Sequence, residues 1–391
     1  MMKLSESGLK LLMYSPLSLR MGAGGDRWLV EMAPRLMKRG IQPTVFATDF
    51  MVKNYRRNPT DWFVDQLVDS GIRYEEAASS SISSTVNTPL MGRGAFTQLS
   101  REMKNHDITY FMNAYFFQDV STWMAKRLAH PAPVISAQHA TLFQDNPFHN
   151  AYIHLVSRSL LRVFDAFHVL NKEDYLTYGR WGLSPAFLIP NGVDTTTFFP
   201  ARSKDDEQFN VLYLGRLDHQ KGIDTLLEAI QFIENKVGDG IVFKIGGTGP
   251  FREHVQRFVR NRPNVQYLGR VPEEDLVQVY NSASVFAMPS RRETFGLVAL
   301  EAMACGTPVV VSDIPGPRSF IEESFARKMP PTNPKLLADA IEWFYHLSLE
   351  HPEEFKSMAK NARAVCVEKF DWEQISDRLS AVIKWVVAGK E

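Results

Sequence analysis

The chain has 391 residues, of which 45% are hydrophobic and 23% are charged. That composition matches a folded globular protein rather than a disordered one, and the length favours two domains of about 200 residues each. Because 44 basic side chains balance 44 acidic ones, no overall basic field indicates binding to nucleic acid.

The two cysteines of the chain, Cys305 and Cys366, are too few for a disulfide framework. They also lack the spacing of metal ligands, which suits a reducing compartment. The N-terminal stretch lacks the uncharged core and cleavage site of a signal peptide, and no run of about 18 apolar residues occurs. We therefore expect a cytoplasmic protein that does not span a membrane.

In the first half of the chain, short apolar runs alternate with amphipathic stretches. Residues 26–39 repeat apolar side chains at three- and four-residue steps, as a helix does. This alternation predicts a parallel sheet with helices on both faces. The runs typical of buried strands are residues 11–14, 44–47, 108–111, 134–137 and 167–170.

The same alternation starts again after residue 205, so we predict two doubly wound domains. An Asn-Gly pair between prolines and a polar run at 203–207 mark the connection between them. Such sheets bind ligands at the carboxyl ends of their strands, so a cleft between the domains is the expected site. The second set of strand candidates is 211–214, 241–245, 265–268, 285–288 and 309–311.

These patterns give the following boundaries. An N-terminal domain covers residues 1–190, a linker covers 191–206, and a C-terminal domain covers 207–371. Residues 372–391 form a last helix, whose apolar face would allow it to pack back on the N-terminal domain; that face carries Ile375, Leu379, Val382, Ile383 and Val386.

The stretch RETFGLVALEAMACGTP (292–308) combines an apolar helix pattern with two carboxylates. Thr294 is a good N-cap type and Gly306 is a typical helix stop, which predicts a helix over 295–305. Glu293 would then lie in the loop at the positive end of this helix, and Glu301 about two turns into it. Because an unpaired buried carboxylate is costly, both are candidates for binding a ligand.

Loops after other predicted strands carry cations or glycines. Arg216 and Lys221 on a glycine-bracketed loop suit a diphosphate. The glycine-rich turns at 246–249 and 22–25 allow close backbone approach, and the second opens a helix whose N-terminus favours an anion. The alternatives are tight packing turns, a solvated charge pair and a surface carboxylate stabilised by a helix dipole.

Several of these segments resemble the retaining glycosyltransferases of family 4, which have the two-domain GT-B fold. The resemblance is carried by GRLDHQKGIDTLLEAI, GGTGPFREHV and RETFGLVALEAMACGTPVVVSD, and most specifically by the Glu, seven residues, Glu pattern. It covers nearly the whole chain, since GAGGDRWLVEMAPRLMKRGIQPTVFATD and IPNGVDTTTFFP are also similar to that family.

The resemblance implies a role for each candidate. Glu293 would bind hydroxyls of the donor sugar, Glu301 the ribose, and Arg216 and Lys221 the diphosphate. His139, which follows a strand of the first domain, would line the cleft near the sugar; its alternative is a satisfied histidine at a strand end. The other donor-binding positions would be Gly24, Gly25, Gly247, Gly249, Arg270, Val271, Thr294, Phe295, Gly296 and Leu297.

The mechanism implied by the family is a front-face transfer of a hexose in which the leaving phosphate takes the proton of the acceptor hydroxyl. We expect no metal, since the chain contains no Asp-X-Asp motif, and no cofactor besides the nucleotide diphosphate sugar. Residues 269–274 would contact the base mainly through backbone, so UDP and GDP sugars stay open. Two other functions also stay open: a nucleotide-sugar epimerase on the same fold, and a non-catalytic nucleotide-sugar-binding subunit.

The acceptor belongs to the N-terminal domain, where residues 115–118 and 144–149 follow predicted strand ends. It would be a sugar, a lipid-linked sugar or a small molecule. Basic residues at 53, 56 and 57 with Trp62 and Phe63 suggest a surface helix that contacts a membrane face, although plain solvated surface is the alternative. The sugar, the linkage and the oligomeric state stay undetermined.

Overall fold

The computed structural model describes residues 8–22, 24–52, 59–81, 83, 89–112, 118–129, 132–140, 142, 146–201 and 208–389. The chain divides into two compact units. The first comprises residues 1–190 and 373–391, and the second comprises residues 191–372. The described residues 191–201 thus belong to the second unit.

The first unit contains a seven-stranded sheet with the order β3-β2-β1-β4-β5-β6-β7, in which every pairing is parallel. The order reverses between β1 and β4, which defines the switch point of a doubly wound sheet. Its strands are β1 (Leu9–Ser15), β2 (Ile41–Thr48), β3 (Arg73–Ala77), β4 (Ile108–Met112), β5 (Val134–Gln138), β6 (Ala166–Val169) and β7 (Ala186–Leu188).

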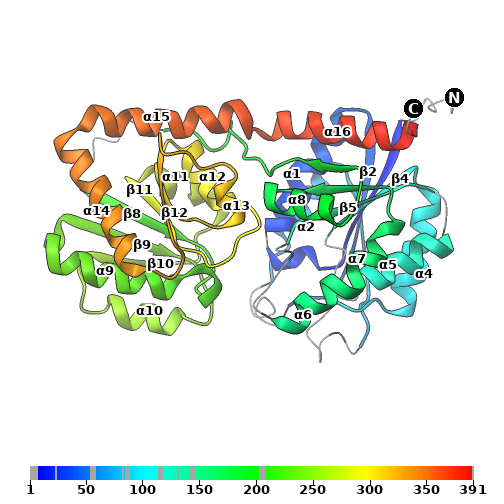
Figure 1. Ribbon diagram of the computed structural model, residues 1–391, viewed down its shortest axis with the longest axis horizontal. Helices are drawn as coiled ribbons and strands as arrows, with labels where there is room; N and C mark the ends of the chain where they lie inside the picture. The colour runs from blue at the N-terminus through cyan, green and yellow to red at the C-terminus, as the bar shows by residue number, and fades with distance from the viewer. Residues whose placement is uncertain are drawn as a thin grey trace. The chain divides into compact units, whose positions relative to one another are not determined.

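Helices cover both faces of this sheet (Figure 1). One face packs against α4 (Arg93–Asn105), α5 (Gln118–Ala129), the segment α6 (Pro147–Tyr152) to α7 (Arg158–Leu160), and α8 (Lys172–Arg180). The segment between α6 and α7 is a π-helical turn, Ile153–Ser157. The other face carries α1 (Gly24–Lys38) and α2 (Trp62–Asp69).

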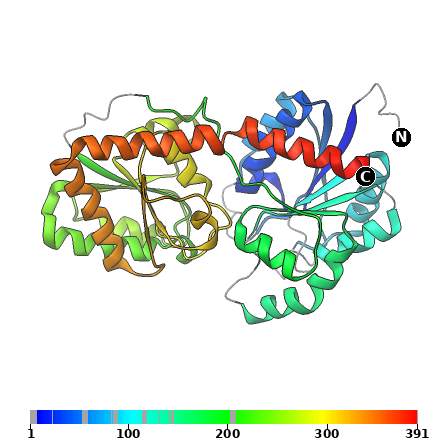
Figure 2. The same ribbon diagram turned by 45° about the horizontal axis from the view of Figure 1, so that its top comes forward.

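The last helix, α16 (Trp372–Ala388), belongs to the first unit from Glu373 onward. Arg39 bonds Glu373 at 3.0 Å and Asp377 at 2.7 Å, and Trp385 contacts the ring of Phe187. Ile375, Leu379 and Ile383 are buried, whereas Val382 and Val386 are half-buried. From Glu373 onward α16 therefore packs against the rest of the first unit, as the red helix in Figure 2 shows.

The second unit contains a six-stranded parallel sheet with the order β10-β9-β8-β11-β12-β13. Its order reverses between β8 and β11, so a second switch point lies there. Its strands are β8 (Phe209–Leu214), β9 (Ile241–Gly246), β10 (Val265–Gly269), β11 (Val285–Met288), β12 (Val309–Ser312) and β13 (Ala326–Met329).

Helices again form two layers around this sheet. One face packs against α9 (Ile223–Val237), α10 (Arg252–Val259) and α14 (Pro334–Glu350). The remaining helices are α11 (Leu276–Asn281), α12 (Leu297–Ala304), α13 (Pro315–Arg318) and α15 (Pro352–Lys369). Side chains of β8, β9 and β11 alternate between the two faces and are almost all buried, as expected for strands covered on both sides.

Candidate active site

Most of the predicted site residues lie at the carboxyl ends of the strands of the second unit. Arg216 and Lys221 follow β8, and Glu293 follows β11. These two strands pair with each other, with Val285 opposite Val211. Residues that are far apart in sequence therefore meet at the switch point, where a doubly wound sheet binds its ligands.

Lys221 and Glu293 form an ion pair. The Nζ of Lys221 lies 2.5 Å from Oε1 of Glu293, and the hydroxyl of Ser290 donates to the same oxygen at 3.1 Å. The side chains are 24% and 10% exposed, respectively. Because both charges are partly desolvated, this charge-assisted bond is stronger than an ordinary surface pair.

Arg216 is held by the loop that carries it. Its Nη2 lies 2.7 Å from Oδ2 of Asp218 and 3.3 Å from Oε1 of Gln220. Asp218 also caps the 3₁₀ turn His219–Lys221, accepting the backbone amide of Lys221 at 3.0 Å. Both predicted phosphate-binding cations thus have carboxylate partners that a diphosphate would have to replace.

Glycines bring the backbones of neighbouring loops into contact. A Cβ on Gly222, whose φ is 68°, would lie 2.0 Å from the carbonyl oxygen of Pro289. A Cβ on Gly247 would lie 1.8 Å from the carbonyl oxygen of Gly215, and one on Gly249 would lie 2.6 Å from that of Leu217. These three positions need glycine because the loops after β8, β9 and β11 approach one another through backbone.

The start of α12 differs from the prediction. The helix begins at Leu297, its N-cap is Gly296 with a φ of 108°, and no side chain caps it, so Thr294 is not its N-cap. Glu293, Thr294 and Phe295 lie in the preceding loop, where a Cβ on Gly316 would come within 2.7 to 2.8 Å of their backbone. The left-handed backbone at Gly296 and this close approach delay the helix by two residues relative to Phe295.

Glu301 is 5% exposed and sits one turn into α12 rather than two. Its Oε2 accepts a hydrogen bond from the hydroxyl of Tyr280 at 2.7 Å. The sequence analysis missed Tyr280, because a tyrosine in a short amphipathic segment carries no signal for this role. Arg270 and Val271 follow β10; Arg270 is exposed, and Cγ2 of Val271 lies within 3.1 Å of a Cβ placed on Gly246.

Gly24, Gly25 and His139 belong to the first unit. The two glycines form the first turn of α1, and Trp28 of the same helix lies with its ring centroid 4.5 Å from that of His139. Trp28 also stacks on Tyr110 of β4, at 5.0 Å and 12°. The buried indole of Trp28 therefore connects α1 with His139, the residue that follows β5.

His139 belongs to a chain of hydrogen-bonded polar groups in which Tyr110 and His168 are buried. Its Nε2 lies 2.8 Å from the hydroxyl of Tyr110, which also bonds Nδ1 of His168, and Nε2 of His168 lies 2.7 Å from the carbonyl oxygen of Ile189. Burial lowers the pKa of His139 well below its usual value, with His168 adding to the effect, and burial lowers the pKa of His168 to about 4. Tyr110 and His168 were not predicted, because a polar residue inside an apolar strand pattern looks like ordinary core.

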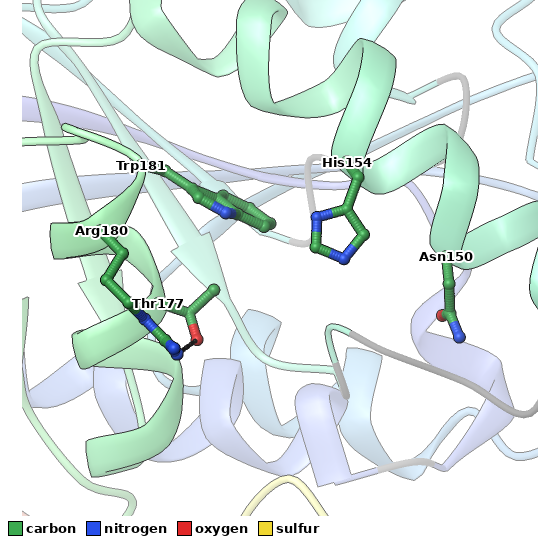
Figure 3. Close-up of a pocket in the computed structure, with 5 residues that line it drawn as sticks. All are labelled: Asn150, His154, Thr177, Arg180 and Trp181. Atoms are coloured by element: carbon green, nitrogen blue, oxygen red, sulfur yellow. Dashed lines mark hydrogen bonds between the residues drawn. The ribbon is translucent and has the colours of Figure 1, made fainter.

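A separate pocket of about 490 Å³ opens in the first unit between two helices (Figure 3). Asn150 and His154 line it from α6 and the π turn, and Thr177, Arg180 and Trp181 line it from the end of α8. The rings of His154 and Trp181 meet at 5.7 Å, and Arg180 bonds the Thr177 hydroxyl at 3.0 Å. Thr177, Arg180 and Trp181 lie at the end of α8 farthest from the carboxyl end of β6, and none of the five lining residues is a predicted site residue.

Parts of the acceptor and membrane predictions fall outside the described residues, namely 53, 56, 57, 115–117, 144 and 145. Of the aromatic residues that remain, Phe63 is 4% exposed and packs in the core, so it is not a surface residue, whereas Phe148 is 85% exposed. Within the described ranges, no helix is long and apolar enough to cross a membrane. Nor do three or more acidic, histidine or cysteine side chains of the described chain come together as a metal site.

Two family models match the chain, one over each half. The model of the glycosyl transferases group 1 matches residues 194–365, and that of glycosyltransferase family 4 matches residues 22–197. The chain belongs to the group 1 glycosyltransferases of the family 4 type. The two matches overlap at residues 194–197, just past the boundary between the units at residue 190.

Curated relatives of this glycosyltransferase include an uncharacterized glycosyltransferase of Methanocaldococcus jannaschii, 36% identical over 185 residues. That match covers 46% of either chain. The glycogen synthase of Mycobacterium tuberculosis is 27% identical over 281 residues, covering 65% of this chain and 66% of that enzyme. The matched part thus spans about half to two thirds of these relatives.

Solved structures resemble the chain over almost its whole length. Sucrose-phosphate synthase from Thermosynechococcus elongatus has a TM-score of 0.75 and 20% identity, covering 98% of this chain and 100% of that one. Anabaena HepE in complex with UDP and glucose has a TM-score of 0.76 and 19% identity, covering 96% and 99%. With its two parallel-sheet domains, this glycosyltransferase therefore has the GT-B fold.

Proposed function

We propose that this glycosyltransferase moves a hexose from a UDP- or GDP-linked sugar to a hydroxyl group of a sugar, a lipid-linked sugar or a small molecule. The observation that carries the proposal is the pairing of Lys221 with Glu293 at the switch point of the second sheet. An ammonium suits a diphosphate and a carboxylate suits sugar hydroxyls. A donor that carries a diphosphate and sugar hydroxyls would bind both side chains in place of the ion pair that they form with each other.

The proposed transfer retains the configuration of the anomeric carbon and uses no metal. The bond from that carbon to the leaving phosphate oxygen breaks while the acceptor oxygen bonds to the same face. The proton of the acceptor hydroxyl passes to the leaving phosphate oxygen. Arg216 and Lys221 stabilise the negative charge that develops on the diphosphate, so positioning and charge stabilisation supply most of the catalysis.

The remaining donor contacts follow from the loops of the second unit. Glu301 would accept hydrogen bonds from the ribose hydroxyls, and residues 269–274 would lie along the base. The backbone at Phe295, Gly296 and Leu297 would face the phosphates, because the N-terminus of a helix favours an anion. In the first unit, we propose that His139 accepts a hydrogen bond from a substrate hydroxyl.

Thermal melting against a panel of UDP and GDP sugars tests the donor. A ligand at about 100 times its dissociation constant adds close to 2.7 kcal/mol to the free energy of unfolding. We expect one donor family to raise the melting temperature of the wild type, and Lys221→Ala and Glu301→Ala to lose much of that increase. Absence of any shift at millimolar concentration would contradict the proposed donor site.

The product then separates the competing functions. Proton NMR of the product with an acceptor present should show the same anomeric configuration as the donor. A changed sugar released without acceptor would identify an epimerase instead. Tight donor binding without any product from a broad acceptor screen would indicate a binding subunit.

A further inference from the structure

We propose that Tyr110 and His168 are positioning residues that hold His139 as a neutral imidazole with its proton on Nε2. The Nδ1 of His139 is then the ring nitrogen that accepts a hydrogen bond from substrate. The role of Nδ1 toward substrate rests on the proposed function. The tautomer itself depends only on contacts within the first unit.

The direction of each hydrogen bond in this series follows from the bond between His168 and the backbone of Ile189. The Nε2 of His168 lies 2.7 Å from the carbonyl oxygen of Ile189, and a carbonyl oxygen can only accept. The Nε2 of His168 therefore carries a proton. In the neutral ring Nδ1 is then an acceptor, so the hydroxyl of Tyr110, which contacts Nδ1, donates to it.

The same argument passes one step further. A phenol hydroxyl has a single proton to donate, and Tyr110 already donates it in the hydrogen bond to Nδ1 of His168. The contact of 2.8 Å between the Tyr110 oxygen and Nε2 of His139 is therefore made by a proton on Nε2. Burial raises the pKa of Tyr110 well above its ordinary value, so a phenolate does not offer an alternative pattern.

The setting favours one fixed arrangement. Tyr110 and His168 are 0% and 1% exposed, so water does not compete for their bonds. Their strands lie on either side of β5, the strand that His139 follows, and Trp28 covers both Tyr110 and His139. A histidine held in this way is a directed and uncharged hydrogen-bond acceptor.

Nitrogen NMR of protein labelled in the histidine rings tests the tautomer directly. The chain has ten histidines, and His139→Gln identifies the signals of His139. We expect the neutral form protonated on Nε2 in the wild type at neutral pH. Detection of the Nδ1-protonated form, or of a cation, would overturn the proposal.

Matched variants test the positioning. Tyr110→Phe removes the hydroxyl. His168→Gln moves the amide group one bond farther from Cβ and loses the acceptor at the position of Nδ1, whereas His168→Asn keeps an oxygen two bonds from Cβ, as Nδ1 is. We expect Tyr110→Phe and His168→Gln to disturb the tautomer and His168→Asn to retain it.

The kinetic readout uses the nucleotide sugar that best stabilises the wild type. Tyr110→Phe and His168→Gln should lower kcat/KM about three- to tenfold, as expected for the loss of one hydrogen bond of ordinary strength. His168→Asn should lower it less. An altered tautomer with unchanged kcat/KM would overturn the positioning role. If the expected tautomer is found but no nucleotide sugar binds, the assignment of the proton stands and the proposed function fails.

Discussion

The ammonium group of Lys221 lies 2.5 Å from the carboxylate of Glu293 although 72 positions separate the two residues in the chain. The contact exists because β8 and β11 are neighbours at the point where the order of the second sheet reverses. The loop that follows β8 and the loop that follows β11 lead to opposite faces of the sheet. Sheets of this kind bind ligands in the space between two such loops. In the proposed function, Lys221 would bind the phosphates of the donor and Glu293 would bind the hydroxyls of its sugar.

Removal of the lysine should weaken nucleotide binding. A charge-assisted hydrogen bond is worth about 1.5 to 3 kcal/mol, so Lys221→Ala should raise the dissociation constant of UDP or GDP about 10- to 100-fold, as measured by calorimetry. Lys236→Ala is the matched control, since Lys236 is 48% exposed and pairs with Asp339 and Glu342 of α14, away from the predicted site. Equal affinities in the wild type and Lys221→Ala would contradict the assigned role.

The glycine contacts predict a large difference between two alanine variants. Gly222 and Gly269 have nearly the same φ, 68° and 70°, so both variants incur a backbone cost of about 1 kcal/mol. Only Gly222→Ala also places a Cβ 2.0 Å from the Pro289 carbonyl oxygen, whereas nothing lies within 4 Å at Gly269. Gly222→Ala should therefore lose at least about 2 kcal/mol more stability in urea unfolding, and similar losses in the two variants would be inconsistent with the contact.

The sequence predicted ten of the strands because buried parallel strands are nearly continuous apolar runs. The three it missed, β3, β7 and β13, all lie at sheet edges. β3 reads Arg-Tyr-Glu-Glu-Ala and β13 reads Ala-Arg-Lys-Met, and charged side chains are typical of edge strands. β7 is only three residues long, so it gives too short a pattern to recognise.

The site was predictable where residues cluster along the chain. Arg216 and Lys221 share one loop, and Glu293 and Glu301 share one stretch, so glycines and charges mark them together. Partners supplied by other strands or helices leave no such mark: Ser290 is one polar residue among many, and Tyr280 meets Glu301 only after α11 and α12 pack. The predicted start of α12 was wrong because the positive φ at Gly296 depends on the loop that precedes it.

Tyr280 should stabilise the protein through Glu301. Tyr280→Phe removes a hydroxyl that donates to a buried carboxylate at 2.7 Å, which should cost about 1 to 3 kcal/mol in urea unfolding and weaken UDP or GDP binding. Tyr267→Phe provides a comparison, because its hydroxyl donates to the uncharged Gly247 carbonyl oxygen at 2.9 Å in a half-buried setting. An equal or larger loss in Tyr267→Phe would argue against a special role for the Tyr280 bond.

Chelation should leave transfer unaffected. In the proposed mechanism Arg216, Lys221 and the start of α12 supply the positive charge that faces the diphosphate, so a divalent ion has no step to assist. We expect the initial rate in excess EDTA to equal that in buffer alone. Loss of activity that manganese or magnesium restores would show that the metal-free mechanism is wrong.

The buried histidines predict how the first unit responds to acid. Burial lowers the pKa of His168 to about 4 from an ordinary 6.5, so between these values the unfolded chain binds more protons than the folded one. Stability from the neutral His168 is therefore present above about pH 6.5 and is lost as the pH falls toward 4, by an amount on the order of 3 kcal/mol. His168→Asn lacks this titration.

Comparison of the two proteins isolates this effect. Burial raises the pKa of Asp174 to about 6, which acts in the opposite direction, but Asp174 is common to both proteins and largely cancels in the difference. Loss of His168 also removes one cause of the lowered pKa of His139, which changes the difference in the same direction as the loss of the His168 titration. Hydrogen exchange of the amides in β4 to β6 reports opening of this unit by itself. We expect the protection of the wild type relative to His168→Asn to fall between about pH 6.5 and 4.5; a constant ratio would mean that His168 is not held neutral by burial.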